Sequence, residues 1–145
     1  AIFSAIKGIV PESSLIVGDH FYTHYNVPFK NIGVITGPCH AEEVALERLS
    51  YLTIACADEE KSGTMSKLLE SEYIKCATSD DVIGTEYAAM LKNIYAIAAG
   101  IAHGLGYGDN FQSVLMSNAI REMKRYVKKV HKMKQSSICD KNTKE

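Results

Sequence analysis

The chain has 145 residues, of which 46% are hydrophobic and 23% charged, and its 16 basic and 17 acidic residues give a net charge of −1. This composition is typical of a globular protein and excludes disordered, collagen-like and coiled-coil classes, while the near-zero charge argues against a nucleic-acid partner. No apolar run reaches the roughly 18 to 20 residues that cross a bilayer, and the first residues lack the basic flank of a signal peptide. We therefore expect a soluble, cytoplasmic protein without a membrane partner.

The charge is unevenly distributed along the chain, which predicts two differently built parts. Residues 1–72 hold 5 basic and 10 acidic residues, whereas residues 73–145 hold 11 and 7. Because the chain does not begin with Met and its first residue already lies in an apolar run, we expect it to be a piece of a longer protein. The cysteines form no C-x-x-C pair, so we expect reduced thiols and no zinc site. They are Cys39, Cys56, Cys76 and Cys139.

Short apolar runs alternate with helical stretches in the first half of the chain. The helices are predicted over residues 12–25, 41–46 and 58–69, and Asp58 is the expected cap of the last one. Strands separated by helices of this length predict an α/β layer with crossover connections, in which the last strand is at an edge. The strands are predicted over Ile2–Ile6, Asn31–Thr36, Tyr51–Ala57 and Tyr73–Thr78.

The hydrophobic period changes after Ser79 and indicates an all-helical part. Ser79 or Asp80 is expected to cap a helix of about 20 residues that has almost no polar face, so we predict that it is buried on most sides. Asp109 or Asn110 is expected to begin a second helix that ends near Lys132, and residues 134–145 are predicted to fray. The predicted fold class is therefore α/β followed by all-α.

Lys92 and Asn93 interrupt the apolar helix and are the most informative residues of the chain. A buried lysine beside a second cation tends toward the neutral amine, which is the form that a general base needs. Asn93 shares its stripe with Glu86, so these two polar side chains could support each other. A snorkelling lysine and a satisfied core amide remain the alternative. The helical neighbours of Lys92 are mostly small and would let a flat ligand approach: Ala88, Ala89, Tyr95, Ala96 and Ala99.

Two glycine-containing segments follow predicted strands. Lys7-Gly8 comes directly after the first strand, where the carboxyl end of a strand faces the ligand crevice of an open α/β sheet. Gly37-Pro38-Cys39-His40-Ala41 follows the second strand and precedes a helix, a position at which backbone N–H groups can hold an anion. A solvated lysine and an ordinary strand-to-helix turn remain the alternatives.

Six short segments form an ordered set along the chain. In this order and at about this spacing they resemble the family of NAD(P)-dependent glycerol-3-phosphate dehydrogenases, over residues 1 to about 126. The segments are Lys7-Gly8, Gly37-Pro-x-x-Ala-Glu-Glu-Val44, Asp81-Val-Ile-Gly84, Leu91-Lys-Asn-Ile94, Ala96-Ile-Ala-Ala-Gly100 and Gly104-Leu-Gly-Tyr-Gly-Asp-Asn110.

The resemblance implies a fold in two parts and a reaction. Residues 1–79 would be the C-terminal part of a Rossmann-type NAD(P)-binding domain. Residues 80–145 would be the first helices of a substrate-binding domain like that of 6-phosphogluconate dehydrogenase. The reaction is reversible hydride transfer between sn-glycerol 3-phosphate and NAD(P)+, which gives dihydroxyacetone phosphate and links carbohydrate metabolism to phospholipid biosynthesis. We also expect a homo-oligomer.

The family's site residues fall on six positions of this chain. Lys92 matches the general base, and Lys7 matches a lysine that contacts both substrate and cofactor and stabilises the developing alkoxide. Asn93 matches a substrate-site amide. Gly37 and Cys39 match further substrate contacts, and Ala41 matches a cofactor contact.

The sequence departs from the family pattern at three places. The family usually has Ser or Thr followed by Phe where Cys39 and His40 stand, and a thiol is a poorer hydrogen-bond donor than a hydroxyl, although the backbone N–H of Cys39 could still serve. The chain has no strand followed by G-x-G-x-x-G, the pyrophosphate-binding turn. The residue that reads the ribose and so selects NAD or NADP would belong to the same upstream unit, so this choice cannot be read from the chain. The family's downstream phosphate-binding arginine is also missing.

Other features have less specific interpretations. His20 and His24 are four residues apart on a predicted helix, but no third ligand accompanies them, so we predict no metal site. Adjacent residues at a turn seldom aim at each other, which argues against Cys39-His40 as a nucleophile and base. The basic run from Arg121 to Lys134 is expected to be a solvated helix end. Two alternative functions stay open: a catalytically silent helical association module, and a nucleic-acid binder that uses this basic helix.

Overall fold

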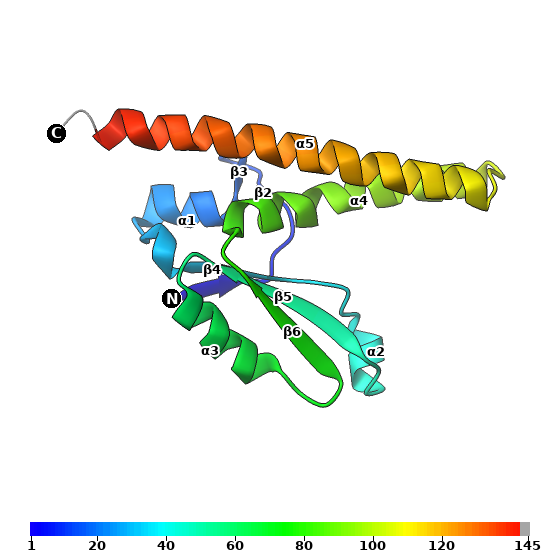
Figure 1. Cartoon of the computed structure of the whole chain (residues 1–145), viewed down its shortest axis with the longest axis horizontal. Coiled ribbons are helices and arrows are strands. Elements are labelled where there is room, and N and C mark those ends of the chain that lie inside the picture. Colours follow the sequence, from blue (N-terminus) through cyan, green and yellow to red (C-terminus); the bar gives the residue numbers. More distant parts are fainter. Residues whose placement is uncertain (143–145) are drawn as a thin grey trace. The chain divides into compact units, whose positions relative to one another are not determined.

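The computed structural model describes the backbone of residues 1–142 and the side chains of residues 1–130. It divides into two compact units between Ala89 and Met90, and each is described by itself. The first unit contains a four-stranded sheet in the order β1-β4-β5-β6 (Figure 1). Its strands are β1 (Ile2–Ser4), β4 (Ile32–Thr36), β5 (Ser50–Cys56) and β6 (Ile74–Ser79).

The sheet is mixed, because not all of its neighbouring strands are parallel and joined by crossover connections. β1 pairs with β4 in parallel and β5 with β6 in parallel, but β4 and β5 are antiparallel. The predicted crossover between these two strands is therefore wrong. The link contains only the five-residue helix α2 (Ala41–Ala45), so the chain turns back at the same edge of the sheet. The prediction that the last strand is at an edge is confirmed, because β6 ends the strand order.

The segment after β1 differs most from the prediction. The predicted helix over residues 12–25 begins only at Val17, as α1 (Val17–Tyr25). Its first residues form instead a small antiparallel hairpin of β2 (Ile9–Val10) and β3 (Leu15–Ile16). Ser14 has a φ of 54°, in the left-handed region, and its N–H donates to the Val10 carbonyl at 2.8 Å. This turn interrupts the helical period.

Helix α3 (Glu59–Leu69) packs against β5 and β6, and a short 3-10 helix, η1 (Phe29–Asn31), precedes β4. The predicted cap of α3 is confirmed, because the Asp58 carboxylate accepts from the Lys61 N–H at 3.2 Å. The core of this unit contains Val34, Ala55 and Val82, with Phe29 packed against them.

Helix α4 (Val82–Gly104) begins where the sequence predicts a helix, but its cap is Asp81 rather than Ser79 or Asp80. The Asp81 carboxylate accepts from the Gly84 N–H at 2.7 Å, and the Ser79 hydroxyl accepts from the Asp81 N–H at 3.1 Å. A Cβ on Gly84 would lie 2.0 Å from an Asp81 oxygen, so glycine is what permits this tight cap.

The prediction that this helix is buried on most sides holds only for its first turns. Val82, Glu86 and Ala89 are buried. In the second unit, three isoleucines of α4 are exposed because no other described residue covers them. They are Ile94 (57% exposed), Ile97 (66%) and Ile101 (60%).

Helix α5 (Asp109–Asn142) is longer than predicted. It continues beyond Lys132 through most of the segment expected to fray, which contains no Gly or Pro to end the helix. The remaining residues, 143–145, lie outside the described part of the chain. A hydrogen bond joins α5 to the later part of α4, because the Gln112 side chain donates to the Ala99 carbonyl at 3.1 Å.

Candidate site at the carboxyl edge of the sheet

The parallel pairing of β1 and β4 brings two predicted site segments to one edge of the sheet. Parallel strands have their carboxyl ends at the same edge, so the segment after Ser4 and the segment after Thr36 both leave the sheet there. Lys7 lies in the first segment and its side chain is exposed. Gly8 has a φ of +143°, and no atom lies within 4 Å of a Cβ built on it, so the space beside the backbone is open.

Gly37 is held tightly against β5. It has a φ of +150°, and a Cβ on it would lie 2.1 Å from the Tyr51 carbonyl oxygen. The next residue, Pro38, accepts a hydrogen bond from the Tyr51 N–H at 3.3 Å. Only glycine satisfies both the backbone angle and the close approach. The turn after β4 is therefore fixed to the neighbouring strand.

Cys39 and Ala41 follow this turn. Cys39 is half-buried, and Ala41 is the exposed first residue of α2. The thiols of Cys39, Cys56 and Cys76 are free, as the sequence predicts, while Cys139 lies outside the residues with described side chains. Burial raises the pKa of Cys76, and the nearby Glu70 carboxylate and Cys39 act in the same direction, whereas a hydrogen bond with Ser66 acts in the opposite one.

Lys92 and Asn93 are neighbours on α4, in the second unit, and both side chains are exposed. The suggested support of Asn93 by Glu86 stays a prediction, because the two residues belong to different units. The Glu86 carboxylate accepts from the Gly18 N–H at 3.0 and 3.2 Å. The other predicted site residues thus follow two strands that end at one sheet edge, whereas Lys92 and Asn93 belong to the second unit. The residues that follow these strands are Lys7, Gly37, Cys39 and Ala41.

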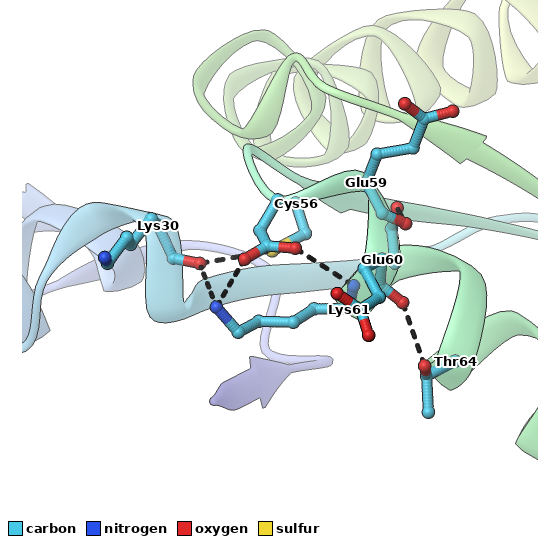
Figure 2. Close-up of polar contacts among 8 residues, drawn as sticks. Lys30, Cys56, Glu59, Glu60, Lys61 and Thr64 are labelled. Atoms are coloured by element: carbon cyan, nitrogen blue, oxygen red, sulfur yellow. Dashed lines mark hydrogen bonds and ion pairs between the residues drawn. The ribbon is translucent and has the colours of Figure 1, made fainter.

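A polar network lies at the opposite edge of the sheet, and the sequence predicts only part of it. The Lys61 amine donates to the Lys30 carbonyl at 3.5 Å and to the Asp58 carboxylate at 2.5 Å. Figure 2 shows the Lys61 side chain extended toward Lys30. The Cys56 thiol donates to the same carbonyl at 3.8 Å. The capping pattern predicts Asp58, but no local signal predicts that the chain 31 residues earlier supplies the second acceptor. This network fixes the start of α3 to the end of η1.

Two cavities lie near this network, and neither contains a predicted site residue. The first, of about 310 Å³, lies at the carboxyl ends of β5 and β6 and is lined by Cys56, Glu59, Ser62, Thr78, Ser79 and Asp80. The second, of about 390 Å³, lies between β1 and α3. Over the described side chains, no three His, Cys, Asp or Glu residues converge to hold a metal.

A mixed sheet with its candidate site at the carboxyl ends of parallel strands, followed by long helices, defines the class of Rossmann-type α/β proteins that carry a helical domain. The model of the NAD-dependent glycerol-3-phosphate dehydrogenase N-terminus matches residues 1–62, and that of the same family's C-terminus matches residues 81–141. The chain belongs to this family of oxidoreductases, which confirms the resemblance found in its sequence.

Individual relatives agree with this assignment. A glycerol-3-phosphate dehydrogenase [NAD(P)+] of Exiguobacterium is 42% identical over 126 residues, which cover 86% of this chain and 37% of that relative. The corresponding protein of Lactiplantibacillus plantarum is 44% identical over 128 residues. The crystal structure of glycerol-3-phosphate dehydrogenase from Coxiella burnetii matches 88% of this chain and 38% of its own, with a TM-score of 0.79 and 30% identity.

The chain thus spans little more than a third of the length of the curated relatives that it matches. Within the described residues, no helix is both long enough and apolar enough to cross a membrane.

Proposed function

We propose that this chain is a working part of an NAD(P)-dependent glycerol-3-phosphate dehydrogenase. The enzyme would transfer hydride reversibly between sn-glycerol 3-phosphate and the cofactor, with dihydroxyacetone phosphate as the other product. The observation that carries this proposal is that both halves of the family match the chain in their proper order, over residues 1–62 and 81–141. The division into domains at residues 1–79 and 80–145 and the cytoplasmic location belong to the same proposal.

The residues at the carboxyl edge of the sheet fit a dinucleotide and a small phosphorylated substrate. Lys7 offers an exposed amine to an anion. Gly8 has no side chain and Ala41 only a methyl group, so a ligand can approach the backbone closely at these two positions. Lys7 and Ala41 would contact the cofactor, and Lys7, Gly37, Cys39 and Asn93 would contact the substrate. The cofactor is NAD or NADP, and a residue that reads the ribose selects between them. That residue follows the pyrophosphate turn, and the G-x-G-x-x-G pattern of this turn does not occur in these 145 residues.

The nicotinamide ring accepts or donates the hydride when the cofactor is bound. Lys92 would remove the proton from the C2 hydroxyl of glycerol 3-phosphate and return it to the C2 carbonyl oxygen in the reverse direction. Lys7 would stabilise the negative charge that develops on that oxygen. Asn93 would orient the substrate by hydrogen bonds. These roles need Lys92 as a neutral amine in one direction and as an ammonium in the other.

A chimeric enzyme tests this proposal, because the chain covers only part of its relatives. The 126 matched residues would replace their counterparts in the Exiguobacterium enzyme, and oxidation of NADH and NADPH with dihydroxyacetone phosphate would be measured. Lys92→Ala is expected to lower kcat by about 100-fold to 10,000-fold, the usual contribution of a general acid or base. The control is Lys67→Ala, which removes an exposed lysine of α3. A folded chimera with no turnover, or a Lys92→Ala variant as active as the parent, would contradict the proposal.

The exposed isoleucines of α4 favour a second candidate, a helical association module without catalytic activity. Ile94, Ile97, Ile101 and Leu105 recur at helical spacing and are all exposed. An uncovered apolar stripe of this length favours association with another helix, which is also the basis for expecting a homo-oligomer. Sedimentation of the chain beside an Ile97→Glu variant tests this candidate. A parent that is monomeric at high concentration would exclude it.

A further inference from the structure

We propose that the outward face of α5 attaches the protein peripherally to an anionic lipid surface. The inference is independent of the proposed catalytic function. It concerns the second unit alone and rests on a basic stripe and an adjoining pair of exposed apolar side chains. The basic stripe consists of Arg121, Lys124, Arg125, Lys128 and Lys129.

The stripe occupies the side of α5 that does not pack against other residues. At 100° per residue, its five members fall within an arc of about 140°. The buried and half-buried positions of the helix, which include Ala119, Met123 and Val127, lie on the opposite side. All five basic side chains are exposed. They therefore project together into solvent.

A single acidic side chain, Glu122, lies among these five cations. The acidic residues of α5 with described side chains are Asp109, more than two turns before the stripe, and Glu122. Burial and, to a smaller extent, the nearby Glu122 carboxylate raise the pKa of Tyr95. Among the residues with described side chains, the five basic groups form no ion pair. Five positive charges within nine residues make a strong local field.

Two apolar side chains continue the same face toward the start of the helix. Phe111 is 42% exposed and Val114 is 59% exposed, and both project in nearly the same direction as Arg121 and Arg125. Phe111 stacks on Tyr107, with ring centroids 4.4 Å apart, so its exposed ring is held in place. An exposed aromatic ring beside a row of cations is an arrangement suited to the interface between lipid headgroups and acyl chains.

A lipid surface fits this face better than a nucleic acid does. Binding of single-stranded nucleic acid would require aromatic rings between the cations, and the only aromatic residue there, Tyr126, points away from the stripe by the helical period. A duplex backbone would pair with the cations but would leave Phe111 and Val114 in water. An anionic bilayer attracts juxtaposed basic residues and also accepts the apolar side chains.

Co-sedimentation of the whole chain with vesicles tests the proposal. Vesicles of equal parts phosphatidylcholine and phosphatidylserine are compared with vesicles of phosphatidylcholine alone. Binding to the mixed vesicles, and its loss as salt is raised, is the expected result. Each cation near such a surface contributes a factor of about five, so Arg125→Gln with Lys128→Gln should weaken binding roughly 25-fold. Val114→Gln should weaken it severalfold, and circular dichroism would verify that each variant is folded.

The control removes two exposed lysines elsewhere, Lys67→Gln with Lys75→Gln, and should change binding little. An equal loss in the control pair would mean that only net charge matters, and it would overturn the proposal. Equal binding to vesicles of phosphatidylcholine alone would also overturn it, as would tighter binding to a DNA duplex than to the mixed vesicles.

Discussion

The Glu86 carboxylate of α4 and the Gly18 N–H of α1, 68 residues apart in the chain, are joined by contacts of 3.0 and 3.2 Å. Helix α1 follows Ile16, which has no side-chain oxygen to cap it. Glu86 supplies the missing acceptor from a distant part of the chain, and its negative charge suits the helix N-terminus. A Cβ on Gly18 would lie 2.9 Å from a Glu86 oxygen, so glycine is what allows the carboxylate to reach the backbone.

Replacing Glu86 is therefore expected to destabilise the first unit. Glu86 is only 2% exposed, so Glu86→Ala leaves a buried N–H without its partner and should lower the free energy of unfolding by about 3 kcal/mol. Glu86→Gln keeps an acceptor of the same shape and should cost less. Urea denaturation measures both, with the exposed Glu72→Ala as the control. Equal midpoints for Glu86→Ala and the control would show that the cap does not contribute to stability.

Gly37 and Gly63 form a matched pair for testing backbone constraints. Gly37→Ala should lower the free energy of unfolding by about 3 kcal/mol, because the new Cβ meets the Tyr51 carbonyl and the backbone angle is unfavourable for alanine. Gly63 is in the interior of α3, where a Cβ meets no atom within 4 Å. Gly63→Ala should therefore stabilise the chain by up to about 1 kcal/mol. A loss of stability in both variants would contradict this assignment of the two glycines.

The cap of α3 predicts a dependence of stability on pH. Hydrogen bonds from the Lys61 side chain and backbone hold the pKa of Asp58 below its ordinary value of 3.8. Because the pKa is lower in the folded state than in the unfolded state, the carboxylate contributes stability that is fully present above pH 3.8 and is lost as the pH falls through the folded value. Urea midpoints measured from pH 6 downward should show the parent losing its advantage over Asp58→Ala at acidic pH. A difference that is constant with pH would contradict the prediction.

Local sequence signals predict the strands of the sheet, the start of α4 and the cap of α3. They fail where a distant residue or a single backbone angle decides the structure. The left-handed conformation of Ser14 replaces the beginning of a predicted helix with a hairpin, and the helical period does not reveal it. The antiparallel pairing of β4 and β5 depends on how the chain returns after α2, which strand propensity does not encode.

The residues of the candidate site can likewise be predicted only in part from local sequence signals. The sequence predicts that Lys7 and Gly37 each follow a strand, and the parallel register of β1 and β4 brings the ends of these strands to one sheet edge. The role of Glu86 was not predicted, because its partner is a backbone N–H of α1 rather than a side chain on its own helix. Several apolar residues of α4 that were predicted to be buried are exposed. Hydrophobicity indicates that a helix face needs a packing partner, but it does not indicate whether these 145 residues provide that partner.

The substrate site can be tested at Cys39, a position at which this chain differs from its family. The family usually has a hydroxyl at this position, and a hydroxyl is a better hydrogen-bond donor than a thiol. In the chimeric enzyme, Cys39→Ser should lower KM for dihydroxyacetone phosphate about twofold to tenfold, the value of one modest hydrogen bond, with kcat nearly unchanged. Cys56→Ser is the matched control, because that thiol donates to the Lys30 carbonyl at the opposite edge of the sheet. An unchanged KM in Cys39→Ser would mean that the substrate contact at this position is made by the backbone N–H, whereas an increased KM would show that the thiol itself is the preferred partner.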